Sequence, residues 1–197
     1  MCKYLILGNG FLGNRLYNYF RDNREDVILS DERIGYINTS KEIKNLIIKH
    51  QPEIVINAIG KTGRPNVDWC QNHKEETFFS NVTIPVFLAE ACNDMDIRMV
   101  HLGSGCIYDD DNEGKGYSES DDPNFTGSFY SKTKIYSEQI LSRYKDVIQL
   151  RIRMPIDNRP GDRNLIDKLL KYNKVINEQN SITYIPDLLK IATELMD

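Results

Sequence analysis

The chain has 197 residues, of which 40% are hydrophobic and 27% charged, as expected for a globular protein with one well-packed core. Its formal net charge of −4 gives no reason to expect a nucleic-acid partner, although a locally basic pocket for a small anion remains compatible with it. No apolar run is long enough to span a membrane, no signal peptide precedes the first strand, and the four cysteines and three histidines lack metal-ligand spacing, so we expect a cytoplasmic protein with reduced thiols, no metal site and no membrane association.

The first predicted strand, residues 3–7, ends in a glycine-rich turn that opens a helical segment. Strand, G-x-G-x-x-G and helix in this order are typical of dinucleotide binding. The glycines allow a tight turn, a close approach of the backbone to a pyrophosphate, and close packing of the helix on the strand. An ordinary glycine-rich turn is the alternative. We predict that the cofactor is bound by Gly8, Asn9, Gly10, Phe11, Leu12 and Gly13.

The second predicted strand, residues 27–29, is followed by residues of mixed chemistry. Ser30 and Arg33 could hold the 2′-phosphate of NADP, whereas Asp31 or Glu32 could accept a hydrogen bond from the free 2′-hydroxyl of NAD. All four could equally be solvated loop residues. We expect NADPH, bound in part by Ser30 and Arg33, and keep NADH as the alternative.

The third predicted strand, residues 53–58, follows a helix over residues 43–50 and ends where a cofactor would lie along the carboxyl edge of a parallel sheet. A polar loop comes next. Residues 75–93 are then largely helical in pattern, with a break or a helix start at Pro85. From these segments we predict further cofactor-binding residues, namely Asn57, Ala58, Gly60, Lys61 and Asn81.

The fourth predicted strand, residues 99–103, leads to Ser104 and a long acidic loop, which in a compact domain is usually functional. The next predicted helix, residues 128–144, carries Tyr130 and Lys134 one turn apart, where the ammonium would lower the phenol pKa. Tyr130 could then exchange a proton with an oxygen that Ser104 also contacts, and Lys134 would bind the cofactor. A chance Tyr-Lys pair and a loop-capping serine are the alternatives.

Strands that alternate with helices, the last strand being residues 147–153, predict an α/β, Rossmann-type, doubly wound parallel sheet. The pattern breaks after Pro155, and two further helices, over 164–172 and 186–196, are predicted to begin a second, smaller lobe. We therefore divide the chain into a cofactor-binding domain, residues 1–153, and the start of a substrate-binding lobe, residues 154–197.

Several segments together carry a family resemblance. The glycine turn, a serine after a central strand and Tyr130-x-x-x-Lys134 resemble the extended short-chain dehydrogenase/reductase superfamily. Within it, residues 62–70, 105–107, 123–134 and 150–156 resemble the nucleotide-rhamnose synthases of the epimerase/reductase type, with dTDP-4-dehydrorhamnose reductases as wider relatives. This resemblance implies an NADPH-dependent enzyme of rhamnose synthesis. Its substrate would be a UDP- or dTDP-4-keto-6-deoxy sugar, reduced at C4 and epimerised at C3 and C5.

The resemblance also implies roles for single residues. Ser104, Tyr130 and Lys134 would be catalytic in reduction, while Cys106 and Lys168 would exchange the protons that the C4 ketone acidifies at C3 and C5. Without the family, a small buried thiol and a solvated lysine are the plainer interpretations of Cys106 and Lys168. Other polar groups could be ordinary surface residues. We predict that the substrate is bound by Arg64, Asn66, Cys106, Asn124, Arg153 and Arg163.

Two alternatives stay open. The chain could be a reductase without epimerase activity, or a non-catalytic, NADP-binding regulatory subunit. A dehydratase is disfavoured, because Gly105 and Cys106 stand where that class has an Asp-Glu pair. Members of the family continue past the position of Met196, so we expect a shortened substrate lobe or a fragment. A homodimer is kept open.

Overall fold

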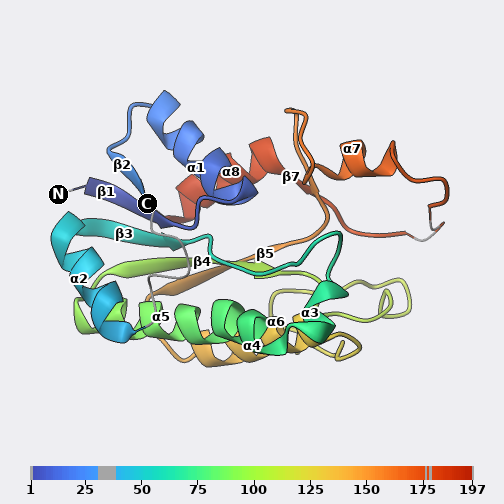
Figure 1. The fold of residues 1–197 in the computed structure, drawn as a ribbon, viewed down its shortest axis with the longest axis horizontal. Helices are drawn as coiled ribbons and strands as arrows, with labels where there is room; N and C mark the ends of the chain where they lie inside the picture. The colour runs from blue at the N-terminus through green and yellow to red at the C-terminus, as the bar shows by residue number, and fades with distance from the viewer. Residues whose placement is uncertain (1, 31–38, 176, 178, 197) are drawn as a thin grey trace.

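Five parallel strands form the centre of the molecule, which the computed structural model describes for residues 2–30, 39–175, 177 and 179–196. The sheet has the order β2-β1-β3-β4-β5, so the chain starts inside the sheet and winds outward in both directions (Figure 1). The predicted doubly wound parallel sheet is confirmed. Its strands are β1 (Cys2–Leu7), β2 (Val27–Ser30), β3 (Pro52–Asn57), β4 (Arg98–Ser104) and β5 (Val147–Ile152).

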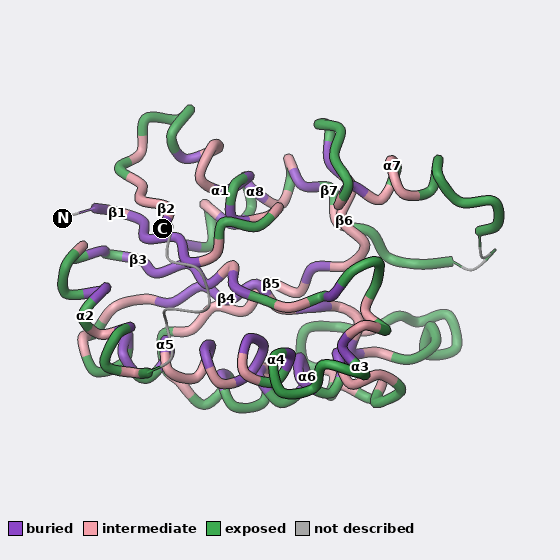
Figure 2. The backbone as a smooth tube through the Cα atoms, in the orientation of Figure 1, coloured by how far each residue is buried: buried purple, intermediate pink, exposed green. Residues whose placement is uncertain are grey.

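The first strand is apolar on both of its faces. Tyr4 and Ile6 belong to one apolar cluster, whereas Leu5 and Leu7 belong to the cluster on the opposite face. This alternation follows from the two-residue period of a strand. A parallel sheet that is covered by helices on both faces requires such two-sided burial. Figure 2 shows the resulting buried band along the strands.

Helices cover both faces of the sheet (Figure 1). The helix predicted over residues 43–50 begins about one turn earlier, at Ser40, because Thr39 is its N-cap residue. The Thr39 hydroxyl accepts a hydrogen bond from the Glu42 N–H at 3.3 Å, and the Glu42 carboxylate accepts one from the Thr39 N–H at 3.0 Å. One face carries α1 (Phe11–Asp22) and α8 (Ile185–Met196), and the other carries α2 (Ser40–His50), α5 (Ile84–Asp94) and α6 (Phe129–Leu141).

The helical stretch before β4 is interrupted, as the proline suggested. Pro85 lies in the first turn of α5, directly after a helical turn of different hydrogen-bond spacing, so its missing N–H falls where the spacing changes. A π-helical turn precedes it and places Asn81 in a buried position. Such single π turns are frequent at functional sites. The elements before α5 are α3 (Trp69–Asn72), α4 (Lys74–Phe78) and the π-helical turn η1 (Phe79–Thr83).

The chain after β5 divides between two places. A small sheet of β6 (Pro155–Ile156) and β7 (Thr183–Tyr184) lies near α7 (Leu165–Leu169), which is shorter than the helix predicted over 164–172. By contrast, α8 returns to the main sheet and packs on the same face as α1. The boundary of a substrate lobe at residue 154 stays a prediction. The residues of α8 that join the core of the sheet are Ile185, Leu189, Ala192 and Met196.

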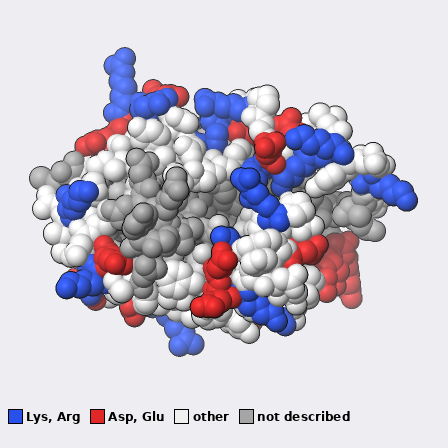
Figure 3. All heavy atoms as spheres, in the orientation of Figure 1, with Lys and Arg blue, Asp and Glu red and all other residues white. Residues whose placement is uncertain are grey.

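The surface carries charges of both signs. On the face drawn in Figure 3, Lys and Arg side chains are interspersed with Asp and Glu. Within the described ranges, no helix is both long and apolar enough to cross a membrane. The same described residues contain no group of three or more His, Cys, Asp or Glu side chains that could hold a metal ion.

Candidate active site

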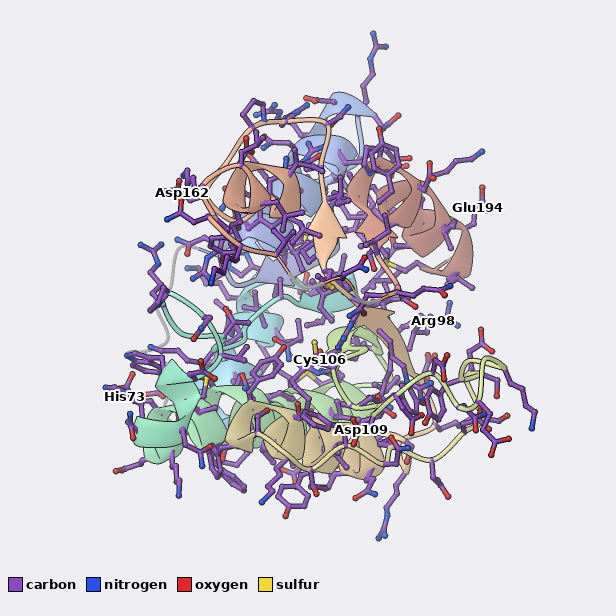
Figure 4. All side chains as sticks on the ribbon, turned by 90° about the vertical axis from the view of Figure 1, so that its right-hand side faces the viewer. His73, Arg98, Cys106, Asp109, Asp162 and Glu194 are labelled. Carbon is purple, nitrogen blue, oxygen red and sulfur yellow. The ribbon has the colours of Figure 1, made fainter. Side chains whose placement is uncertain are left out.

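A cavity of about 660 Å³ opens at the carboxyl ends of the central strands. This is the edge at which doubly wound sheets bind ligands. Figure 4 is turned so that the right-hand side of Figure 1 faces the viewer, and Cys106, one of the lining residues, lies near the centre of the view. The lining residues that were predicted from the sequence are Gly10, Phe11, Leu12, Ala58, Gly60, Lys61, Arg64, Asn66, Asn81, Ser104, Cys106, Tyr130, Lys134, Arg163 and Lys168.

The three glycines of the N-terminal turn have the three different roles that the motif predicts. Gly8 has a φ of +104°, and a Cβ there would stand 2.7 Å from the backbone of Ala58. A Cβ on Gly13 would overlap the carbonyl oxygen of Gly8, so only glycine lets α1 lie this close. Gly10 has open space where a Cβ would be, and it lines the cavity. Gly8 and Gly13 therefore shape the turn, while Gly10 is free to approach a ligand.

The N-terminus of α1 is suited to an anion. Gly10 is its N-cap residue, no side chain caps the helix, and its first turn contains no acidic residue. The first backbone N–H groups are therefore available to an anionic ligand. The Asn14 side chain fixes the turn by donating hydrogen bonds to the carbonyl oxygens of Gly10, at 2.9 Å, and of Asn9. These residues fit the pyrophosphate of a dinucleotide.

The residues predicted to choose between NADPH and NADH are only partly described. Ser30 ends β2, is buried and does not line the cavity. Arg33 lies outside the described residues, as do Asp31 and Glu32. The preference for NADPH therefore stays a prediction.

Two predicted cofactor residues, Asn57 and Asn81, hold the loop that forms one wall of the cavity. The buried Asn57 Oδ1 accepts a hydrogen bond from the Ile59 N–H at 3.0 Å. Asn81 clamps Lys61: its Oδ1 accepts from the Lys61 N–H at 2.7 Å, and its Nδ2 donates to the Lys61 carbonyl oxygen at 3.1 Å. Asn81 also lines the cavity. Asn57 does not line it, and it shapes the cavity wall only by holding the backbone of Ile59.

Ser104 and Tyr130 meet in the cavity wall. Ser104 ends β4, and its hydroxyl accepts a hydrogen bond from the Cys106 N–H at 3.1 Å. Burial raises the pKa of Tyr130 to about 12, which outweighs the lowering effect of its hydrogen bond with Ser104. The prediction of a lowered phenol pKa is therefore wrong. The ammonium that was expected to lower it donates instead to the Leu102 carbonyl oxygen, at 3.0 Å.

Lys134 lies one turn after Tyr130 on α6, and both line the cavity as the spacing predicts. Burial lowers the pKa of Lys134 to about 8, while the charge of Glu138 acts in the opposite direction. The helix is started by Ser128, whose hydroxyl accepts a hydrogen bond from the Ser131 N–H at 3.0 Å. This cap sets where the first turn, and hence the tyrosine, begins.

Cys106 and Lys168 reach the same cavity from different segments, one from the loop after β4 and one from α7. Burial, and then the nearby charge of Arg163, lower the pKa of Lys168. Arg163 is itself held by the loop after β3, since it donates to the Gly63 carbonyl oxygen at 3.2 Å. The cavity therefore joins groups that lie more than sixty residues apart in the chain.

Two of the predicted substrate residues do not line this cavity. The Asn124 side chain is used inside the acidic loop, where it accepts from the Asp109 N–H at 2.8 Å. Arg153 borders a second cavity of about 610 Å³, and its Nε donates to Asn180 Oδ1 at 2.9 Å. Arg64, Asn66 and Arg163 do line the first cavity. A direct role for Asn124 and Arg153 stays a prediction.

Other residues of this region were missed. Met154 lines the cavity with a φ of +40°, in the region that favours glycine, and its position before Pro155 is the only local signal in the sequence. A buried ion pair joins Arg15 of α1 to Asp157, with Nε–Oδ2 and Nη2–Oδ1 distances of 2.6 and 2.9 Å. His101 lies beside Lys134, with 3.4 Å between its Nε2 and the lysine Nζ. Neither of these pairs is adjacent in sequence, so no local pattern indicates them.

Residues 4–155 match the model of the NAD-dependent epimerase/dehydratase family. The trifunctional UDP-glucose 4,6-dehydratase/UDP-4-keto-6-deoxy-D-glucose 3,5-epimerase/UDP-4-keto-L-rhamnose-reductase of Arabidopsis thaliana is 42% identical over 212 residues, which cover 98% of this chain and 30% of that protein. A bifunctional dTDP-4-dehydrorhamnose 3,5-epimerase/dTDP-4-dehydrorhamnose reductase of the same plant is 44% identical over 151 residues, which cover 74% of this chain and 50% of that protein.

Among solved structures, the L780 UDP-rhamnose synthase of Acanthamoeba polyphaga mimivirus is similar to this chain with a TM-score of 0.92 and 29% sequence identity. The match covers 99% of this chain and 71% of the viral one. The chain therefore spans 30% of the trifunctional relative, 50% of the bifunctional one and 71% of the viral structure.

Proposed function

This chain belongs to the NAD-dependent epimerase/dehydratase family, and we propose that it reduces the C4 ketone of a nucleotide-4-keto-6-deoxy sugar with NADPH. The observation that carries the proposal is the single cavity that Ser104, Tyr130 and Lys134 share with the glycine turn at Gly10. The names of both plant relatives include such a reductase activity, which supports it. Because the chain spans only part of those proteins, their activities are proposed for it on the strength of the site.

A bound nicotinamide cofactor would supply the hydride. The residues of the chain hold the C4 oxygen and give it a proton. Tyr130 is protonated at neutral pH, as an ordinary tyrosine is, and burial raises its pKa further, to about 12. Its hydroxyl, hydrogen-bonded to Ser104, donates the proton as the carbonyl becomes an alcohol. The ammonium of Lys134 adds positive charge near the oxygen on which negative charge develops. The raised pKa makes Tyr130 a weak acid, so its proton moves to the C4 oxygen only as the arriving hydride makes that oxygen strongly basic.

Epimerisation at C3 and C5 uses the same ketone, which acidifies the protons on its neighbouring carbons. The Cys106 sulfur takes one of these protons from one face of the sugar, and the Lys168 ammonium returns a proton to the opposite face of the same carbon, so its configuration inverts. Proton exchange with water then restores both groups. The negative charge of the intermediate enolate rests on the C4 oxygen, where Ser104 and Tyr130 hold it. A lowered pKa makes the Lys168 ammonium a better proton donor. Both plant relatives carry a 3,5-epimerase activity in their names, in support of this second step.

Incubation with NADPH and either UDP- or dTDP-4-keto-6-deoxyglucose tests the proposal. We expect NADPH oxidation and formation of a nucleotide-L-rhamnose. In Tyr130→Phe the rate should fall by about 100-fold or more, because the proton donor is lost, while NADPH affinity measured by calorimetry stays within a few-fold. If NADPH binds and neither sugar causes oxidation, the reductase proposal is wrong and the non-catalytic subunit is favoured.

The Cys106→Ser variant separates the two activities in the same assay. It should lose hydrogen exchange at C3 and C5 in D₂O but still reduce a sugar that has already been epimerised. Cys92→Ala is a suitable control, since the Cys92 thiol is buried in the apolar cluster beneath the sheet and does not line the cavity. Normal product formation by Cys106→Ser from the unepimerised sugar would contradict the epimerase role.

The finer parts of the proposal need separate measurements. Comparison of NADPH with NADH at equal concentration tests the expected preference for NADPH, and comparison of the two sugar nucleotides tests the choice of base. We also propose a cytoplasmic location, and we keep a homodimer open. Light scattering of the purified protein tests its assembly, with a monomer at all concentrations as the contrary result.

A further inference from the structure

A buried histidine links the catalytic lysine to the loop that forms one wall of the cavity. His101 of β4 is opposite Asn57 of β3 in the sheet register, and both are buried. The His101 Nδ1 lies 3.0 Å from Asn57 Nδ2. On the other side of the ring, Nε2 lies 3.4 Å from Lys134 Nζ and 3.5 Å from Ser137 Oγ. The proposed reaction gives this histidine no role.

The hydrogen bonds of Asn57 define which ring nitrogen carries the proton. Asn57 Oδ1 already accepts the Ile59 N–H at 3.0 Å, so the amide group that faces the histidine is the donor, Nδ2. His101 Nδ1 must therefore accept, and a neutral ring then carries its proton on Nε2. A doubly protonated ring would set two donors against each other at Nδ1. Burial and the neighbouring Lys134 also lower the pKa of His101 well below its ordinary value.

This tautomer limits what Lys134 can contact inside the protein. The protonated Nε2 can donate to Ser137 Oγ, 3.5 Å away, and it cannot accept a hydrogen bond from the ammonium. The Leu102 carbonyl oxygen accepts one from Lys134 at 3.0 Å. We propose that His101 is a positioning residue for Lys134. As a neutral ring held by Asn57, it fills the space behind the ammonium without offering it an acceptor, so the remaining N–H groups of Lys134 are directed to the cavity. Its effect on turnover rests on the proposed function, whereas the tautomer and its neutrality do not.

Nuclear magnetic resonance of the whole protein tests the tautomer without any substrate. The chain has three histidines, so ¹⁵N-labelling of histidine gives three ring systems in a long-range ¹H–¹⁵N correlation, and the spectrum of His101→Gln assigns the one of interest. We expect His101 to carry its proton on Nε2 and to stay neutral between about pH 5 and 8, where an unperturbed histidine titrates. A proton on Nδ1, or titration of His101 within that range, would overturn the proposal.

Two substitutions test the effect on Lys134. In His101→Gln, the side-chain oxygen can accept from Asn57 and the amide N–H can face Lys134, so the pattern of the imidazole is kept. His101→Leu has neither group. Leu cannot be held by Asn57, so it no longer fixes the space behind the lysine Nζ, and we expect His101→Leu to lower kcat about tenfold with little change in KM. His101→Gln, which Asn57 can still hold, should keep most of the wild-type kcat.

His50→Gln and His50→Leu are the matched controls. His50 does not line the cavity, so both variants should leave kcat unchanged. Equal losses in His101→Gln and His101→Leu, with both proteins folded, would point to simple packing and contradict the positioning role. Unchanged kcat in His101→Leu would also contradict it. If the wild-type chain has no activity, the proposed function fails, and the histidine spectrum still decides whether the ring is held as inferred.

Discussion

Burial lowers the pKa of Lys134 to about 8, so its ammonium is lost at a pH where an exposed lysine keeps its proton. Because the proposed reduction uses the charged form, kcat/KM should be high below pH 8 and fall as pH rises above it. The measurement is kcat/KM against pH, which reports groups of the free enzyme. A sugar that is already epimerised removes any contribution from Lys168.

The Lys132→Met variant is the matched control. Lys132 is exposed on the same helix, so kcat/KM of this variant should still show an alkaline limb, that is, a fall above pH 8. The Lys134→Met protein should show a low rate without this limb. A limb that begins only near pH 10, in the ordinary range of lysine, would contradict the assignment.

Tyr130 shows which part of a site can be predicted from residue types. The spacing of Tyr130 and Lys134 placed both on one helix face, and both line the cavity. The predicted direction of the phenol pKa was wrong, because burial of Tyr130 in the folded chain raises it. Likewise, no local pattern pairs His101 with Lys134, since their contact arises from the packing of α6 on the sheet. Spacing along one helix is local information, and burial is not.

The ion pair between Arg15 and Asp157 fastens α1 to the segment after β6. Its side chains are only 11% and 1% exposed, and two hydrogen bonds join them. Removal of one partner leaves the other charged and buried, so Arg15→Met should lower the free energy of unfolding by about 3–5 kcal/mol. Urea unfolding measures it. The loss should also weaken sugar binding, because Asn164, next to Arg163, holds the backbone of Asp157.

Arg21 offers a control on the same helix. It pairs with Asp22 on the surface, where both side chains are more than half exposed, and Arg21→Met should cost about 0–1 kcal/mol. Similar losses for Arg15→Met and Arg21→Met would show that the buried pair contributes no more than a surface one. Replacing both Arg15 and Asp157 by apolar residues should recover much of the loss.

The elements differ in how well sequence alone defines them. All five strands were predicted within one or two residues at each end. The inner strands β1, β3 and β4 are short, largely buried apolar runs, whereas the edge strands β2 and β5 are mostly half-buried. The start of α2 was missed by three residues, although Thr39 and Glu42 form a capping box. The tie between Arg15 and Asp157 could not be predicted, since 142 residues separate them and only the closed fold brings them together.

At the scale of the whole molecule, the family resemblance drawn from the sequence motifs is confirmed by the match over residues 4–155. Motif residues from both halves of the chain do meet at one sheet edge, as parallel strands require. The last helix was predicted to begin a second lobe, but α8 packs on the main sheet. The apolar face of this helix could pack on a second lobe or on the main sheet. The sequence does not show which of the two apolar surfaces lies beside it in the fold.

Because α8 packs on the main sheet, we expect a substitution that weakens this packing to destabilise the whole sheet. Leu189 is buried in the same apolar cluster as Tyr4 and Ile6 of β1. Leu189→Ala should therefore lower the free energy of unfolding by about 2–5 kcal/mol and reduce the protection of β1 amides from hydrogen exchange by the same free energy. If α8 belonged to an independent lobe, only its own amides would lose protection.

Leu195→Ala on the same helix separates packing from helix propensity. Leu195 is 51% exposed, so its replacement removes a leucine from α8 without opening a cavity in the core. Alanine is at least as good a helix former as leucine, and the stability of the chain should change by about 0.5 kcal/mol or less. A large loss in Leu195→Ala, or an unchanged exchange rate of β1 amides in Leu189→Ala, would mean that α8 is not a working part of the sheet's core.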